Sequence, residues 1–592
     1  MRFAKIPRGT TRDIVLLILC ASLTIAAPHV SRSQGQSTAA ESRAPALTVK
    51  SISQNYKAAA SAEERRAALI QLQSLVKSGS GGAKLALAEI YSGQHGEEDI
   101  DSVAAVGLYN ELAASGDAYA ALQLSNIYFT GSLVSTDDAK GLAYLRQAAH
   151  LGSVVAKRKL GERLLKFPEQ LDSALTSLKD AAAEDDIASI ILLGEVYSRG
   201  TFLKENGALA VSYYKKAEAL GDDYSAFRLG ELYSDGLIVP PDSDEAIKYL
   251  TSASEAGLTS AKIKLADFHI KGVGVKADPP KGAAMLRAII EDENHAAALI
   301  ALGDLLSTGD YLPKDAEAVE FYRRATELDN SWAWYRLGQI YRLGTFGEKD
   351  VPFAKKCFDE AFKLGLPAAQ VAILQMQAEQ STSEQDSQWI LSLSQLVETG
   401  NLPAALALAD SYYWGKEVQS NPEKALELLD RLSAAGAYQA TSKLISFHRD
   451  APGGKIRRSV DRAALILETR ASQFNSRQFR KEKILLSAAR ATTTEEFDAV
   501  ISDVLNAPPN IRLDTVAELR VTNPNLYVYF AQRRMQDSGL YKGRLDGRLT
   551  KATIAALNRL CETHSQGEVC KAGPLTYPAA RIIAVLSTQF RS

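Results

Sequence analysis

The chain has 592 residues, of which 46% are hydrophobic and 23% are charged, as is ordinary for a soluble protein. Lys and Arg (68) nearly balance Asp and Glu (70), which leaves a formal net charge of −2 at pH 7. This balance gives no indication of a nucleic-acid partner or of general attraction to a charged membrane surface.

Residues 1–33 have the pattern of a secretion signal. An apolar stretch from Ile14 to Ala27 is too short to span a membrane comfortably, and it follows a basic segment with Arg2, Lys5, Arg8 and Arg12. Two alternatives stay open: an outer-membrane lipoprotein, which Cys20 suggests, and an uncleaved signal anchor. Leu19 disfavours lipidation, because lipoprotein signals place a small residue before the cysteine. We therefore expect cleavage and a periplasmic location.

The stretch that follows, residues 34–50, is polar and rich in Ser and Ala. Such a composition cannot bury much apolar surface, so we predict a flexible leader. A helical pattern begins near Ser51.

The segment Leu-x-x-x-Tyr-x-x-Gly recurs at a spacing close to 36 residues. Its clear copies are Leu124-Tyr128-Gly131, Leu193-Tyr197-Gly200, Leu229-Tyr233-Gly236, Leu337-Tyr341-Gly344 and Leu408-Tyr412-Gly415. A fixed period in this range predicts a stacked repeat array. Residues 51–450 should therefore form an all-α solenoid of about ten to eleven helix-turn-helix repeats, followed by a small C-terminal helical domain.

Each repeat is predicted to contain two helices. The first carries Ala, Leu and Tyr on one face, as in Ala120, Leu124 and Tyr128, and a Gly then ends it. The second carries Ala and an aromatic residue and ends at another Gly. No single pair buries its apolar face alone, so neighbouring repeats must supply the core.

Over roughly residues 83–450 this pattern resembles the Sel-one-like repeat family, relatives of the tetratricopeptide repeats. The match weakens near 160–170 and near 371–400, where a polar run occupies residues 379–385. The resemblance implies a non-enzymatic scaffold that binds envelope proteins, with roles in exopolysaccharide export, envelope signalling or envelope organisation. The architecture names neither the partner nor the oligomeric state.

Two aromatic clusters interrupt the repeats. They are Trp332, Trp334 and Tyr335, and Tyr413 with Trp414. Trp and Tyr are enriched at binding hot spots, so these clusters are candidates for sugar or partner binding. Both clusters also overlap core positions of the period, and a structural role is the alternative.

Residues 451–524 are predicted to form a basic helical connector. Eleven Lys and Arg face four Asp and Glu between residues 449 and 490. Either these cations form a solvated helix face, or they bind an anionic exopolysaccharide or an acidic protein. The candidates for binding are Arg457, Arg458, Arg480 and Lys481. Ala507-Pro508-Pro509-Asn510 indicates a boundary before the last domain.

Residues 525–592 carry a second resemblance. A helical segment, the turn-rich run from Gly539 to Gly547 and a following helix with Thr553 are similar to a small peptidoglycan-binding-like domain. The resemblance implies peptidoglycan contact, with Tyr541 and Asp546 as candidate residues. Thr550 and Cys561 depart from the family's pattern. In an oxidising periplasm, Cys561 and Cys570 could pair and close a small loop.

We find no His-Glu-x-x-His, Cys-x-x-Cys, Gly-x-Ser-x-Gly or phosphate-loop motif. No catalytic residue, metal or cofactor is therefore predicted. Three hypotheses follow: a periplasmic scaffold, an accessory protein that binds anionic polysaccharide directly, and a cell-wall hydrolase with a wall-binding tail. The last has the least support, because no catalytic constellation accompanies it.

Overall fold

The computed structural model describes residues 43–199, 205–236, 238–309, 311–379, 386–415, 418–562, 573 and 575–588. Within these residues the structure is helical, apart from loops and one isolated bridge between Gln94 and Gly96. The prediction of an all-α solenoid with paired helices is confirmed. The predicted signal peptide, residues 1–33, lies outside the described residues.

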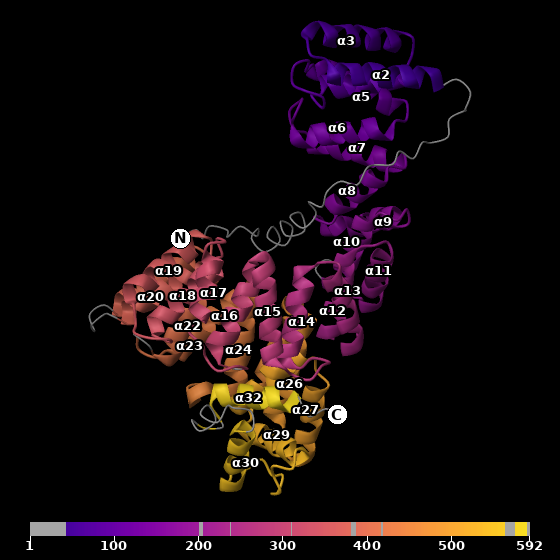
Figure 1. Ribbon diagram of the computed structural model, residues 1–592. Coiled ribbons are helices and arrows are strands. Elements are labelled where there is room, and N and C mark those ends of the chain that lie inside the picture. The colour runs from indigo at the N-terminus through magenta and orange to yellow at the C-terminus, as the bar shows by residue number, and fades with distance from the viewer. Residues whose placement is uncertain are drawn as a thin grey trace. The chain divides into compact units, whose positions relative to one another are not determined.

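The chain divides into two units, Met1–Ala156 and Lys157–Ser592. The first unit contains α2 (Arg43–Ala58), α3 (Ala62–Lys77), α4 (Gly81–Tyr91), α5 (Ser102–Ala114), α6 (Ala118–Thr130), α7 (Asp138–His150) and the start of α8 (Val154–Leu164) (Figure 1). Helix α2 begins inside the predicted leader. Val49, Ile52 and Tyr56 explain this difference, because together they bury one face of α2 in the first core.

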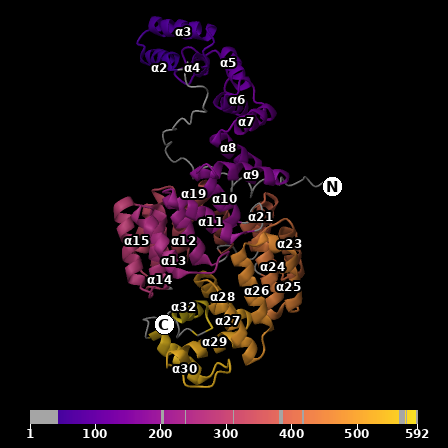
Figure 2. The ribbon, with the colours of Figure 1, turned by 90° about the vertical axis from the view of Figure 1, so that its right-hand side faces the viewer.

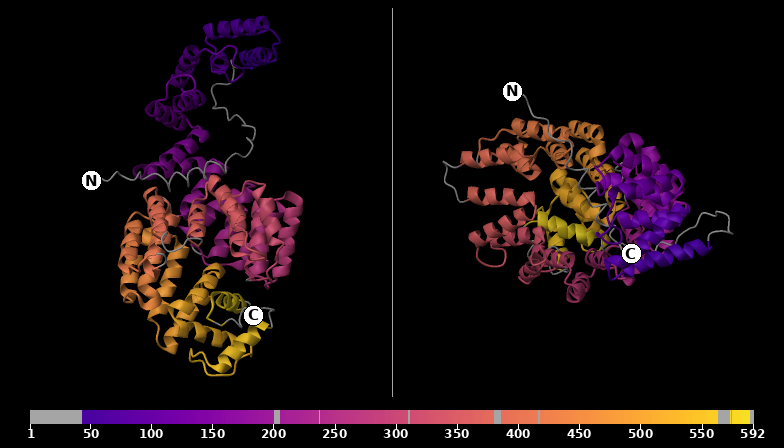
Figure 3. Two further views of the ribbon diagram at one scale, coloured as in Figure 1. Left: turned by 90° about the vertical axis from the view of Figure 1, so that its left-hand side faces the viewer. Right: turned by 90° about the horizontal axis from the view of Figure 1, so that it is seen from above.

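The second unit continues the helix pairs. Its repeat helices are α9 (Leu171–Ala182), α10 (Ile187–Arg199), α11 (Gly207–Ala219), α12 (Asp223–Asp235), α13 (Ser243–Glu255), α14 (Thr259–Lys271), α15 (Pro279–Glu293), α16 (Ala296–Thr308), α17 (Ala318–Thr326), α18 (Ser331–Leu343), α19 (Val351–Lys363), α20 (Pro367–Glu379), α21 (Asp386–Glu398), α22 (Leu402–Trp414), α23 (Pro422–Ala434), α24 (Tyr438–Asp450) and α25 (Val460–Thr469). Seen from above, these pairs form an arc around the yellow C-terminal helices (Figure 3, right). Along the described chain, α4/α5 through α24/α25 make eleven pairs.

Short polar residues begin most of these helices, and glycine ends many of the first ones. The Asp117 side chain accepts a hydrogen bond from the Ala120 amide, and Asn401 does the same for Ala404. Six glycines take a left-handed backbone conformation directly after a first helix, at Gly131, Gly236, Gly272, Gly309, Gly344 and Gly415. The predicted stops at these glycines are confirmed.

Glycine also sets how closely the two helices of a pair approach. A Cβ placed on Gly303 would lie 2.8 Å from the ring of Tyr322, and one on Gly338 would lie 2.6 Å from Phe358. Both aromatic side chains are completely buried. The small residue in the first helix therefore makes room for the aromatic residue of the second.

The C-terminal helices are α26 (Ser476–Arg490), α27 (Thr494–Leu505), α28 (Pro509–Thr522), α29 (Pro524–Asp537), α30 (Lys551–Glu562) and α32 (Tyr577–Thr588) (Figure 2). One hydrophobic cluster runs from Ile484 to Ala584 and includes residues of all six helices. This core crosses the boundary predicted at residue 525, because apolar residues of α26–α28 pack with those of α29–α32. We call these six helices the C-terminal module.

Tyr311, in the loop between α16 and α17, connects the module to the middle of the solenoid. Its half-buried ring packs against the core of the C-terminal module and also against the core around α14–α19. Within the second unit, the C-terminal module therefore contacts the solenoid at two places. One is Tyr311, and the other is the solenoid helices that directly precede the module in sequence.

Candidate functional site

The first helices of successive repeats contact one another through a ladder of polar side chains. Arg336 of α18 lies 3.0 Å from Asp304 of α16, and Lys443 of α24 lies 2.6 Å from Asp410 of α22. The Tyr224 hydroxyl donates to the Glu195 carboxylate over 3.3 Å. Cation, carboxylate and tyrosine thus hold neighbouring first helices in register along one side of the solenoid.

Two first helices carry the same aromatic and basic pattern on this side. Tyr224, Phe227 and Arg228 of α12 occupy the positions that Trp332, Tyr335 and Arg336 occupy in α18. We call these six residues the first-helix face. Sequence reasoning missed the copy in α12, although 332 − 224 = 108 residues is three repeat periods. The spacing aromatic-x-x-aromatic-Arg was the available signal.

The structure separates the three residues of the first predicted aromatic cluster. Trp332 is 50% exposed, and its ring meets Tyr335 edge-on with 5.7 Å between centroids. Tyr335 in turn lies 5.4 Å from buried Phe358. Trp334 is partly buried and packs against two core clusters. Trp332 is therefore the accessible member, Tyr335 supports it, and Trp334 belongs to the core.

The second aromatic cluster divides in the same way. Tyr413 is fully buried, stacks on Phe447 at 4.1 Å and donates its hydroxyl to the Pro452 carbonyl over 2.9 Å. Trp414 is partly exposed and meets the Tyr413 ring edge-on at 5.1 Å. Of the two, only Trp414 is exposed to solvent.

A buried ionic cluster joins the last solenoid pair to the C-terminal module. Arg449 of α24 is completely buried and lies 2.7 Å from Asp450 and 2.8 Å from Glu482 of α26. Glu482 also accepts from the Ser442 hydroxyl at 2.7 Å. Burial raises the pKa of Glu482, while Arg449 opposes this increase. These bonds fix α24 against α26.

Three of the four basic residues proposed for docking bind the chain itself. Arg458 donates to the carbonyls of Arg449 and Ala489, both over 2.8 Å. Lys481 pairs with Glu518, which raises the lysine pKa although burial opposes the increase. Arg480 donates to the Asn506 carbonyl at 3.0 Å, and Arg457 is exposed. Much of this basic stretch thus bonds to other parts of the chain, but among the described residues only four of its cations have carboxylate partners: Arg449, Arg470, Lys481 and Arg490.

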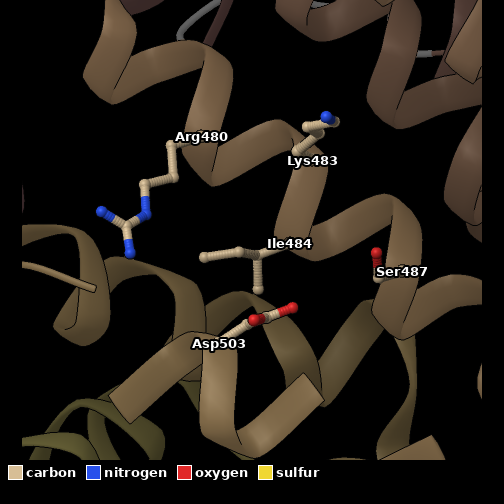
Figure 4. A pocket seen from close by; sticks show the side chains of 5 residues that line it. All are labelled: Arg480, Lys483, Ile484, Ser487 and Asp503. Atoms are coloured by element: carbon tan, nitrogen blue, oxygen red, sulfur yellow. The ribbon is translucent and has the colours of Figure 1, made fainter. Parts of the chain in front are cut away.

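Arg480 also lines a surface hollow between α26 and α27. The hollow has a volume of about 360 Å³ and is lined by Arg480, Lys483, Ile484, Ser487 and Asp503 (Figure 4). Figure 4 shows the Asp503 carboxylate on the α27 side and the Lys483 ammonium directed away from it. Cationic, anionic and aliphatic groups alternate, so the hollow has no single charge preference.

In the connector between α29 and α30, the predicted glycan-binding residues turn inward. Tyr541 is only 6% exposed and donates to the Arg544 carbonyl at 3.0 Å. The Asp546 carboxylate accepts from the Arg548 amide at 3.0 Å, which lowers its pKa. Gln532, fully buried on α29, donates to Tyr541 and accepts from the Asp546 and Gly547 amides. Sequence reasoning did not single out Gln532; an amide directly after the apolar run Leu526–Ala531 was the signal.

Cys561 is buried and disulfide-bonded, and Cys357 is a buried free thiol. Cys570 lies outside the described residues, so the pairing of Cys561 with Cys570 stays a prediction. Among the described residues, no helix is long and apolar enough to cross a membrane, and no group of three or more His, Cys, Asp or Glu is arranged to hold a metal ion.

Comparison with known families identifies the repeats. A family model described as the Sel1 repeat matches residues 118–153, 187–222, 223–258, 259–291, 296–330, 333–366 and 402–436. The unmatched stretches 154–186 and 367–401 contain the two places where the sequence pattern weakens. The predicted Sel-one-like repeats are therefore confirmed over seven segments, and the peptidoglycan-binding-like resemblance of residues 525–592 stays a prediction.

Individual relatives were also found. An uncharacterized protein of Neisseria meningitidis serogroup B is 33% identical over 106 residues, which cover 18% of this chain and 22% of that protein. The chain thus spans about a fifth of the length of this curated relative. A protective antigen of uropathogenic Escherichia coli with an SLR fold is 20% identical, covers 82% of this chain and 98% of its own, and has a TM-score of 0.40. A Sel1 repeat protein from Oxalobacter formigenes is 21% identical over 60% of this chain and 99% of its own, with a TM-score of 0.44.

Proposed function

We propose that this chain, which carries seven Sel1 repeats, is a non-enzymatic periplasmic scaffold that holds envelope proteins on its first-helix face. Sel1 repeat solenoids generally mediate protein–protein interactions. The secretion pattern of residues 1–33 supports the periplasmic location. The family resemblance supports a place in exopolysaccharide export or in envelope organisation.

One observation carries the scaffold proposal: Trp332 is exposed, yet it is held in place. Tyr335 supports its ring from the side, and Arg336 is fixed by Asp304 of the preceding repeat at 3.0 Å. A rigid aromatic residue beside a positioned arginine is the composition of a protein-binding hot spot. The contact with Tyr335 restricts the Trp332 side chain in part, which lowers the entropic cost of ordering it on binding.

Site-specific photo-crosslinking from position 332 in cells tests this proposal. Position 362 is the matched control, because Phe362 is 42% exposed but lies on a second helix, α19. We expect a discrete crosslinked protein from position 332 that is absent from position 362. Replacing Trp332 by Ala should abolish co-purification of that protein. Equal crosslinking from both positions would contradict the proposal.

We further propose that the C-terminal module tethers the scaffold to peptidoglycan. The resemblance of residues 525–592 supports this, although Tyr541 and Asp546 bond to the connector itself. Sedimentation of the whole chain with purified sacculi tests the tether. Deletion of 525–592 is a poor control, because these residues share a core with α26–α28. If the whole chain stays in solution, the tether is wrong and the scaffold proposal is unaffected.

A further inference from the structure

From its exposed charges, we propose that the connector between α29 and α30 binds a membrane surface that contains anionic lipids. The inference goes beyond the scaffold function and concerns the C-terminal module rather than the first-helix face of the solenoid. It rests on the side chains that the connector directs outward, after Tyr541 and Asp546 have turned inward. Figures 1 and 2 show this end of the module, with α29 and α30 at the lower edge.

Four exposed cations lie in the connector and at the first residue of α30: Lys542, Arg544, Arg548 and Lys551. None of them forms an ion pair within the described part of the chain, where the ion pairs nearest in sequence are those of Arg534 and Arg581. By contrast, Arg449, Arg470, Lys481 and Arg490 of the basic stretch all have carboxylate partners. Arg457 and Arg462 of that stretch are also exposed without an ion pair among the described residues, so both regions have unpaired cations, and the connector is the one in which every cation is of this kind.

One acidic residue, Asp546, lies among these cations and offsets one of them. Asp546 is half-buried, and its carboxylate accepts from the Arg548 amide and from the Gln532 side chain. Counting Lys542, Arg544, Arg548 and Lys551 against Asp546, residues 538–551 carry a net charge of 4 − 1 = +3. Such a cluster is attracted to an anionic surface at short range.

An aliphatic surface accompanies the cations. Leu549 is 38% exposed between Arg548 and Lys551, and Ala552 and Ala555 are exposed on the first turns of α30. An exposed aliphatic side chain flanked by cations is suited to the lipid–water interface, where the apolar group inserts and the charges meet headgroups. The connector offers no exposed aromatic ring, since Tyr541 is its only aromatic residue and is buried. The exposed groups of the connector are therefore cationic and aliphatic, the combination suited to an anionic lipid surface.

Flotation with lipid vesicles tests the inference. The chain lacking residues 1–33 avoids any contribution from the apolar signal segment. We expect it to float with vesicles of phosphatidylglycerol and phosphatidylethanolamine, and not with vesicles of phosphatidylcholine alone. Replacing Lys542, Arg544, Arg548 and Lys551 by Gln should lower the partition coefficient by about a hundredfold or more, because each cation contributes about fivefold. High salt should weaken binding in the same direction.

The control variant loses the same number of positive charges, but from other parts of the chain. Gln substitutions at four other exposed cations, Lys57, Lys77, Lys179 and Lys356, should leave vesicle binding within about threefold of wild type, because these residues lie outside the connector. Leu549→Asp should weaken binding, and Leu549→Trp should strengthen it, because Trp favours the interface. Far-UV circular dichroism of each variant verifies that the helices are retained.

Three results would overturn the inference: no flotation of the unsubstituted chain, equal flotation with neutral vesicles, or equal loss in the connector and control variants. Sacculi and vesicles are assayed separately, so this failure and that of the peptidoglycan tether are distinguishable. Retention on sacculi without vesicle flotation would support the tether alone. Vesicle flotation that depends on the connector, without sacculus retention, would support the lipid site alone.

Discussion

At the scale of single residues, one buried amide organises the C-terminal connector. The Gln532 side chain donates to the Thr553 hydroxyl and the Arg548 carbonyl, and it accepts from the Asp546 and Gly547 amides. The backbone amides and carbonyls of a turn lack the regular hydrogen-bond partners that a helix or sheet provides. In this connector a side chain supplies those partners. The inward direction of Tyr541 and Asp546 follows from this amide.

Gln532→Ala should therefore destabilise the module by about 2–4 kcal/mol, because several buried donors and acceptors lose their partner. Hydrogen exchange of peptides covering residues 541–550 should accelerate, and the denaturation midpoint should fall. Gln536→Ala is the matched control, because Gln536 is exposed one turn later on α29. Equal effects of the two substitutions would contradict the role given to Gln532.

At the scale of elements, helix pairs depend on a small residue facing a large one. Gly303 of α16 meets the ring of buried Tyr322 of α17, whereas a Cβ on Gly107 of α5 would meet nothing within 4 Å. Both glycines lie inside helices. Alanine substitutions at the two positions therefore distinguish the destabilisation caused by crowding from the stabilisation that comes from a higher helix propensity.

Gly303→Ala should destabilise the solenoid by about 1–3 kcal/mol through overpacking. Gly107→Ala should stabilise it by about 0.5–1 kcal/mol, because alanine restricts the unfolded chain and favours the helix. Thermal denaturation of the two variants should shift the midpoint in opposite directions. A stabilising effect at both positions would show that Tyr322 can move aside.

A different kind of contact joins α24 to α26: the ionic cluster of Arg449, Asp450 and Glu482. Arg449→Met should cost about 3–5 kcal/mol, because it leaves a buried carboxylate without its cation. Lys443→Met on the same helix removes a more exposed pair with Asp410 and should cost less than about 1 kcal/mol. Chemical denaturation of the two variants provides the comparison, and similar losses would contradict the importance of burial.

The same cluster predicts a dependence on pH. Burial raises the pKa of Glu482 and Arg449 opposes it, so Arg449→Met should raise that pKa further. A carboxyl with a higher pKa in the folded state stabilises the fold below its unfolded pKa, and this contribution is lost as pH rises through the folded pKa. The loss of folding stability caused by Arg449→Met should therefore become smaller as pH falls from neutral toward 4.5, the ordinary pKa of Glu. Adding Glu482→Gln should remove this dependence; a deficit that grows in acid would contradict it.

At the scale of the whole molecule, the helices that follow residue 524 complete the core of the C-terminal module. Leu526, Phe530 and Met535 of α29 pack in one cluster with Leu485, Val516 and Leu519, among others. A chain that ends at residue 524 should expose this cluster, and α26–α28 should lose hydrogen-exchange protection. Helices α22 and α23, whose core is separate, serve as the internal control. Unchanged protection of α28 would show that the two parts fold independently.

Repeated features and local features of the fold could be predicted from the sequence. The motif around Tyr128, Tyr233 and Tyr341 recurs with the period of the helix pairs, so the solenoid was predictable. The roles of the basic residues were not, because Glu482 is 33 residues from Arg449 and Glu518 is 37 from Lys481. Composition counts such charges as free, whereas the packing of α24, α26 and α28 pairs them.

Tyr311 has a consequence for how this protein can evolve. Repeat arrays commonly gain or lose a unit, because each repeat contacts only its neighbours. Here a ring in the loop after α16 packs against a core that begins at Ile484. Duplication or loss of a repeat between these two points would carry Tyr311 away from that core. We therefore expect homologues to keep a constant number of repeats between Tyr311 and the C-terminal module, and to vary more freely in number on the N-terminal side.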